Sequence, residues 1–129
     1  MGRQGRRNRD GGQSVVEFAF ILPLLVILLF GIVEVGRMLM QTNVLTQAAR
    51  EGARAAAIGA DSTSAAARAE DVLQAAGITP ASIDVTGPDA DHMMLVVVTT
   101  DFHVLSPGTV LPFPKTLVLR GASAMRLEG

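Results

Sequence analysis

The 129-residue sequence contains no cysteine, tryptophan or tyrosine, and its only aromatic residues are five phenylalanines. Without cysteine the chain has no disulfide framework, no thiolate zinc site and no cysteine nucleophile. The scarcity of aromatic residues argues against a stacking platform for single-stranded nucleic acid. A net charge of −1 offers no overall attraction to phosphate. We therefore expect no nucleic-acid partner. The length of 129 residues fits a single domain.

Charge is also scarce and is unevenly distributed. Charged residues make up 18% of the chain against 49% hydrophobic residues, and the mean hydropathy is +0.38. Residues 1–12 hold four arginines and one aspartate, a net charge of +3, so the remainder carries −4. This balance is unusual for a soluble domain and indicates a segment made for lipid.

A long apolar run follows the basic N-terminus. Residues 18–33 carry no charge, and residues 15–35 are interrupted only by Glu17 and Glu34. At about 1.5 Å per residue the longer stretch measures roughly 32 Å, close to the ~30 Å hydrocarbon core of a bilayer. The run is longer than a secretory signal requires, and no small-x-small cleavage site follows it. It predicts one membrane span, with the N-terminus in the cytoplasm and the chain after Arg37 outside.

Glu17 is an expensive residue for this place. It follows only two apolar residues at the cytoplasmic edge of the span, and an ionisable group at depth in lipid costs about 2.5–3.5 kcal/mol. Two interpretations are open: the carboxylate reaches back to the lipid headgroups, or it has a partner in the membrane.

The N-terminal residues resemble a known family. Gly12, Gln13, Glu17 and Phe18 match the class IV prepilin pattern of the Flp type, in which glycine precedes the cut, glutamate is fifth after it and an aromatic residue follows. Residues 11–59 resemble TadE-like proteins, the pseudopilins of tight-adherence (Tad) pilus systems. The resemblance implies cleavage by a prepilin peptidase between Gly12 and Gln13. It also implies that Glu17 pairs with the N-terminal amine of a neighbouring subunit.

The resemblance further implies a non-enzymatic minor pseudopilin without cofactors, anchored in the bacterial inner membrane and active in pilus assembly, priming, adhesion or Tad secretion. Its expected partners are the prepilin peptidase, other pilins and pseudopilins, Tad assembly proteins and inner-membrane lipid. A mature length of 117 residues exceeds that of the short Flp major pilins. The alternatives are an uncleaved single-pass protein whose external domain binds a partner or ligand, and a membrane-anchored hydrolase using His92 or His103.

The fold class predicted is α+β. The apolar helix, with Pro23 as a candidate kink, should continue as an amphipathic helix to Ile58 because no further proline interrupts it. The spacing of four between residues places a stripe on one face, made of Val44, Ala48, Gly52 and Ala56. Such a stripe allows close helix packing, either against a partner subunit or against this chain's own sheet.

The C-terminal part predicts a short second helix and a small antiparallel sheet of about three strands. The helix should begin at Asp61 or Ser62 and reach about Ala76. Residues 83–86, 93–102 and 116–128 have strand patterns, with 93–102 as a central strand covered on both faces. Gly121 predicts a bulge or a close backbone approach. Residues 106–115 form the connecting loop.

These patterns divide the chain into a basic leader over residues 1–12, a transmembrane helix over 13–37 and an extracytoplasmic α+β domain over 38–129. No catalytic or metal-ligating set is expected. His92 and His103 lie near Asp89, Asp91 and Asp101 in the sequence, but Asp-x-Asp beside Gly-Pro is typical of a polar turn. No activating partner or complete ligand set can be assembled from these residues.

Overall fold

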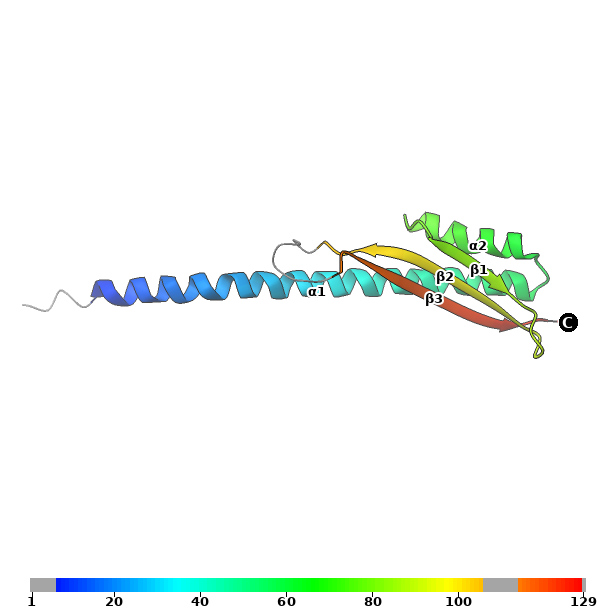
Figure 1. Cartoon of the computed structure of the whole chain (residues 1–129), viewed down its shortest axis with the longest axis horizontal. Helices are drawn as coiled ribbons and strands as arrows, with labels where there is room; N and C mark the ends of the chain where they lie inside the picture. Colours follow the sequence, from blue (N-terminus) through cyan, green and yellow to red (C-terminus); the bar gives the residue numbers. More distant parts are fainter. Residues whose placement is uncertain (1–6, 106–113, 129) are drawn as a thin grey trace, which may run out of the picture. The chain divides into compact units, whose positions relative to one another are not determined.

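A computed structural model describes residues 7–105 and 114–128. The elements follow in the order α1 (Arg7–Ala57), α2 (Ser62–Ala75), β1 (Ser82–Thr86), β2 (Met93–His103) and β3 (Thr116–Arg126), as Figure 1 shows. The predicted α+β class is confirmed, and the order of elements is the one predicted. The expected loop 106–115 falls largely outside the described residues, as do Arg3 and Arg6 of the leader.

The chain divides into two compact units, Met1–Val35 and Gly36–Gly129. The described part of the first unit is helix alone, and α1 runs through Pro23 without a break. The second unit contains the end of α1, then α2 and the sheet. A single helix has no core of its own, so all of the protein's buried core lies in the second unit among the described residues.

The sheet is a three-stranded antiparallel meander in the order β1-β2-β3. Its register is continuous, from Met93 opposite Arg126 to His103 opposite Thr116. No residue is left over in this register, so β3 has no bulge at Gly121. The alternative prediction, a close backbone approach, is the one the structure contains: a β-carbon on Gly121 would lie 2.6 Å from the carbonyl oxygen of Leu45.

The central strand is covered on one face only, which corrects the prediction of two covered faces. Burial alternates along β2, with the even-numbered residues from Met94 to Phe102 buried. The odd-numbered side chains are half-buried or exposed, and Leu95 is 38% exposed. The apolar residues of both parities suggested a strand between two layers. The described chain supplies only one layer of helices, on the face of Val96 and Val98.

The core joins α1, α2 and the inner face of the sheet. Its buried members are Leu45, Ala48, Ala49, Ala53, Ala69, Leu73, Val96 and Val98. A smaller cluster contains Ala56, Ala65 and Met94. Because alanines and a glycine dominate the helix contact, the two helices approach closely: a β-carbon on Gly52 would lie 3.1 Å from the Ala65 carbonyl oxygen and 3.2 Å from the Ala69 β-carbon.

The ends of the elements are tied by local hydrogen bonds. Asp61 is the N-cap residue of α2, with φ −64° and ψ 161°, which confirms one of the two predicted starts. The Ser64 hydroxyl donates to Asp61 Oδ1 over 2.5 Å. At the other end of the domain, the Glu128 backbone N–H donates to the Ala57 carbonyl over 3.1 Å. The chain after β3 thus satisfies a carbonyl at the C-terminus of α1 that no helical partner could reach.

Candidate functional site

The residues of the prepilin-type motif lie on consecutive turns near the start of α1. Gly12, Gln13, Glu17 and Phe18 are all exposed, and nothing lies within 4 Å of the place where a β-carbon on Gly12 would sit. The Gln13 side-chain amide donates to Glu17 Oε1 over 3.3 Å, one helical turn away. This exposed contact between neighbouring turns leaves the carboxylate accessible to a further partner.

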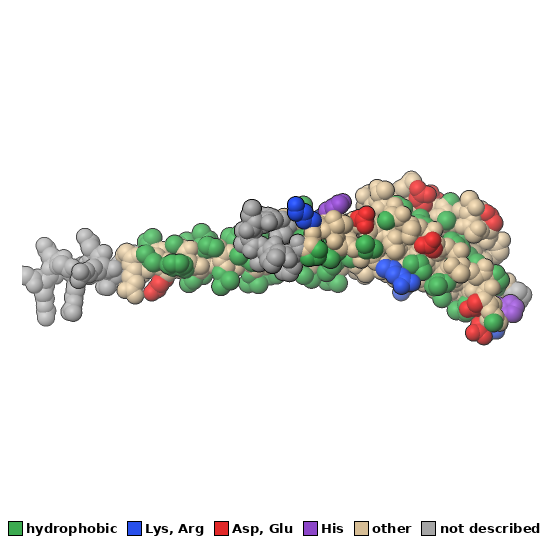
Figure 2. Space-filling model, viewed as in Figure 1, with side chains coloured by type: hydrophobic (Ala, Val, Ile, Leu, Met, Phe, Trp, Pro, Cys, Tyr) green, Lys and Arg blue, Asp and Glu red, His purple; other side chains and the backbone are tan. Residues whose placement is uncertain are grey.

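The helix surface after Glu17 is apolar on all sides. Most of the large hydrophobic side chains between Val15 and Val35 are exposed, with Phe20 79% exposed and Leu24 69% exposed. Figure 2 shows these hydrophobic side chains along the first half of α1. An uninterrupted apolar surface of this kind is not stable in water and marks a contact with lipid or protein. Gly12–Ala57 is long and apolar enough to cross a membrane, by length and composition.

The predicted packing stripe is buried within the domain. Ala48, Gly52 and Ala56 are buried and Val44 is half-buried. Gly52 lies close to α2 and to Val96 of the sheet: a β-carbon at this position would be 3.2 Å from the Val96 Cγ1 atom. The intrachain alternative therefore accounts for this stripe. A second buried row, Leu45, Ala49, Ala53 and Ala57, lies beside it, and its own spacing of four is the sequence signal that would have revealed it.

The opposite face of the same helix segment is polar. Asn43, Gln47, Arg50, Glu51 and Arg54 are all exposed. At the start of the second unit, the Arg37 guanidinium lies over the ring of buried Phe102, 5.2 Å from its centroid. This cation–π contact joins α1 to the end of β2. Sequence reasoning placed Arg37 only as a boundary of the apolar span and did not anticipate this role.

The histidines do not form a site with the nearby carboxylates. His92 precedes β2 and His103 ends it, so the two lie at opposite ends of an 11-residue strand. Asp89 belongs to a turn, where its Oδ1 accepts the backbone N–H groups of Asp91 and Met93 at 3.0 and 2.8 Å. Among the described residues no group of three or more His, Asp or Glu side chains could hold a metal ion.

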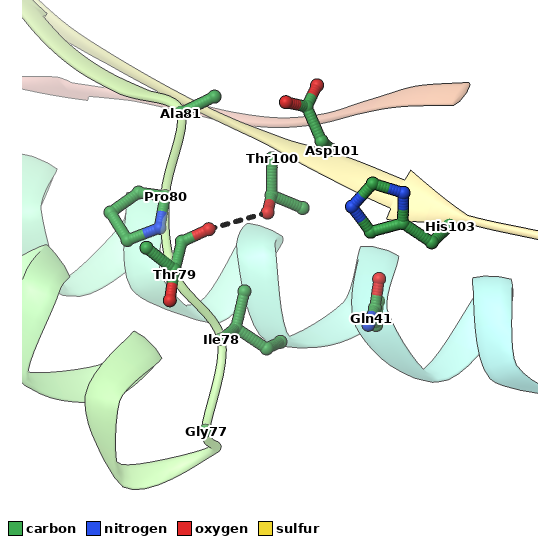
Figure 3. Close-up of a pocket in the computed structure, with 9 residues that line it drawn as sticks. All are labelled: Gln41, Gly77, Ile78, Thr79, Pro80, Ala81, Thr100, Asp101 and His103. Atoms are coloured by element: carbon green, nitrogen blue, oxygen red, sulfur yellow. Dashed lines mark hydrogen bonds between the residues drawn. The ribbon is translucent and has the colours of Figure 1, made fainter. Parts of the chain in front are cut away.

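A cleft lies where β2 extends beyond β1. It has a volume of about 400 Å³ and is lined by Gln41, by residues 77–81 and by Thr100, Asp101 and His103. Figure 3 shows these residues coming from three segments: α1, the connection from α2 to β1, and the end of β2. The Thr100 hydroxyl donates to the Thr79 carbonyl over 2.7 Å, which closes one side of the cleft.

Residues 12–54 match the family model described as TadE-like protein. The match covers a third of the chain and spans the motif, the apolar run and most of the buried helix. It indicates a pilin-like protein associated with Tad pili, which interacts with other pilus components. Neither the curated proteins nor the solved structures contain a significant match.

Proposed function

We propose that this chain is a minor pseudopilin of a Tad pilus, processed by a prepilin peptidase between Gly12 and Gln13. The observation that carries the proposal is the position of the family match, which begins at Gly12. That residue stands immediately before the expected cut. Removal of residues 1–12 takes away the four arginines and leaves a new α-amine on Gln13 at the start of the apolar helix.

Glu17 is the group that neutralises this new positive charge. It lies one turn after Gln13, it is exposed, and it accepts a hydrogen bond from the neutral Gln13 side-chain amide, which does not balance its charge. In an assembly of parallel apolar helices, the Glu17 carboxylate of one subunit pairs with the Gln13 amine of a neighbour. Removing one partner of a buried ion pair typically costs about 3–5 kcal/mol, enough to decide whether a subunit is incorporated.

The orientation follows from the charges at the two ends of the span. Four arginines precede the apolar run, so the N-terminus lies in the cytoplasm and the domain after Arg37 lies outside the bacterial inner membrane. The folded outer domain, with its own core, distinguishes the chain from a bare pilin helix. It supports a role in assembly, priming, adhesion or secretion rather than as the repeating body of the filament.

The test is the mass and N-terminal sequence of the protein isolated from native membranes, with and without the cognate prepilin peptidase. We expect a chain that begins at Gln13 and depends on the peptidase. A chain that retains residues 1–12 in the presence of the peptidase would contradict processing. It would favour the alternative of a permanent single-pass anchor whose outer domain binds a partner.

A further inference from the structure

The sheet is incomplete at one end, and the gap coincides with the cleft. β1 pairs with β2 only as far as Ser82 opposite Thr99, whereas β2 continues to His103. The chain before β1 turns away at Pro80, and this connection forms one wall of the cleft. In the described chain no strand lies beside residues 100–103 on the β1 side. We propose that this notch binds an extended peptide of a partner protein, which adds beside the end of β2 with a basic side chain next to Asp101.

The backbone of β2 presents the necessary groups. The backbone N–H of Val104 donates to the Lys115 carbonyl, and the N–H of Leu127 donates to the His92 carbonyl. Even-numbered residues of β2 therefore bond to β3, and in an antiparallel ladder the odd-numbered residues turn their N–H and C=O groups to the other side. For Asp101 and His103 that side is the notch. An extended peptide can pair with these groups, as in other cases of strand addition.

The side chains around the notch favour a hydrogen-bond donor and a positive charge. Gln41 Oε1 is buried without a hydrogen-bond partner in the described structure. A hydrogen-bond donor on a group that enters the notch beside Gln41 would satisfy this oxygen. Asp101 is exposed and forms no ion pair with a described residue, so a lysine or arginine is the complementary side chain.

Strand geometry assigns the two preferences to neighbouring residues of the peptide. Figure 3 shows Thr100 directed toward α1 and Asp101 directed to the opposite side of β2. Successive side chains of an added strand alternate in the same way. One residue of the peptide points inward to Gln41 and carries a donor such as a threonine hydroxyl. The next points outward and carries the basic group. The segment is short, because Ala81 and β1 block its continuation along β2.

The experiment uses the full chain, labelled with 15N, in detergent micelles. The probe is the peptide acetyl-VTKVT-amide, whose β-branched residues favour an extended backbone. We expect chemical-shift changes at the amides of Asp101 and His103 on titration to millimolar concentration. The same peptide N-methylated at its central residues should produce none of these changes, because it cannot complete the ladder. The peptide acetyl-VTEVT-amide should bind more weakly.

Two variants of the protein provide a matched pair. Asp101→Asn should weaken binding of the lysine peptide about two- to fivefold, the range typical of an exposed ion pair. Asp91→Asn removes another exposed carboxylate, two residues before the start of β2, and should leave binding unchanged. The proposal is overturned if the amide shifts of Asp101 and His103 do not change with the lysine peptide. It is also overturned if the glutamate peptide or the N-methylated peptide binds as tightly as the lysine peptide. These outcomes do not depend on cleavage at Gly12, so they are independent of the proposed processing.

Discussion

Gly121 in the third strand lies directly against the backbone of Leu45 in α1. A β-carbon at position 121 would sit 2.6 Å from the Leu45 carbonyl oxygen and 2.7 Å from its β-carbon. Neither group is the movable end of a side chain, so the helix itself would have to shift. Leu45 is fully buried in the main core cluster. The distance between helix and sheet is thus set at a position where only glycine fits.

We expect Gly121→Ala to destabilise the outer domain by about 1–3 kcal/mol, because overpacking against a fixed backbone forces the layers apart. The effect is measured as the midpoint of urea unfolding of the full chain in detergent. Unfolding is monitored through hydrogen exchange of the β2 amides. Gly36→Ala is the matched control, since nothing lies within 4 Å of its position. In a helix this control should be neutral or stabilising. Equal stability of the two variants would contradict the close approach.

The elements of this fold could be predicted from the sequence because each is bounded by strong local signals. Proline-free alanine-rich sequence gave the end of α1 within one residue of Ala57. Gly87 and Pro88 marked the end of β1 correctly at Thr86. The strand pattern over residues 116–128 predicted β3, which begins at Thr116 and ends at Arg126.

The environment of the elements could not be predicted in the same way. Leu95 and Val97 look like core residues in the sequence, yet they lie on the outer face of β2. Across β3 they stand opposite Ala124 and Ala122. Whether a second layer covers that face depends on the total number of elements, which local periodicity does not report. The motif residues Gly12 and Glu17 were located by resemblance, and their roles depend on groups of other molecules.

The contact between Arg37 and Phe102 is expected to contribute about 0.5–1 kcal/mol to stability, the range for a cation–π pair at a partly exposed site. Because Arg37 has a further interaction, a double-mutant cycle is required to isolate the pair. The cycle combines Arg37→Met with Phe102→Leu and compares the unfolding free energies of all four proteins. A coupling energy near zero would contradict the contact. The pairing of Arg54→Met with Phe102→Leu supplies the additive reference, because Arg54 is exposed on the polar face of α1.

The hydrogen bond from the Ser64 hydroxyl lowers the pKa of Asp61 below its ordinary value of 3.8. A carboxyl whose pKa is lowered by folding stabilises the folded state at pH values above 3.8, and this contribution is lost as the pH falls through the folded-state pKa. We expect Ser64→Ala to raise the pKa of Asp61 toward 3.8, as measured by NMR titration of the carboxyl carbon. An unchanged pKa for Asp61 would contradict the assigned cause.

Gly12→Ala should slow or block processing. The added methyl group must enter the peptidase beside the scissile bond, and in the uncut chain it meets nothing within 4 Å. The substitution therefore leaves the fold of the precursor intact. The ratio of precursor to mature protein in membranes, read by mass, measures the effect. Gly31→Ala, a glycine in the same helix with the same open surroundings, should be processed at the normal rate. Normal maturation of the Gly12 variant would count against the proposed cleavage site.

Glu17→Ala should preserve membrane insertion and reduce pilus assembly. Removing the carboxylate takes an ionisable group away from the apolar run, so insertion becomes easier by up to about 2.5–3.5 kcal/mol. The same change leaves the Gln13 amine of a neighbouring subunit unpaired, which costs about 3–5 kcal/mol in a buried assembly.

Membrane content and pilus content of this chain are quantified separately in the same cells. Glu51→Ala, an exposed carboxylate in the outer part of α1, is expected to affect neither. Normal membrane content together with reduced pilus content indicates a pairing role. A glutamate that only reaches the lipid headgroups forms no ion pair with a neighbouring subunit, so its removal would not reduce pilus content. Normal piliation by the Glu17 variant would remove that role.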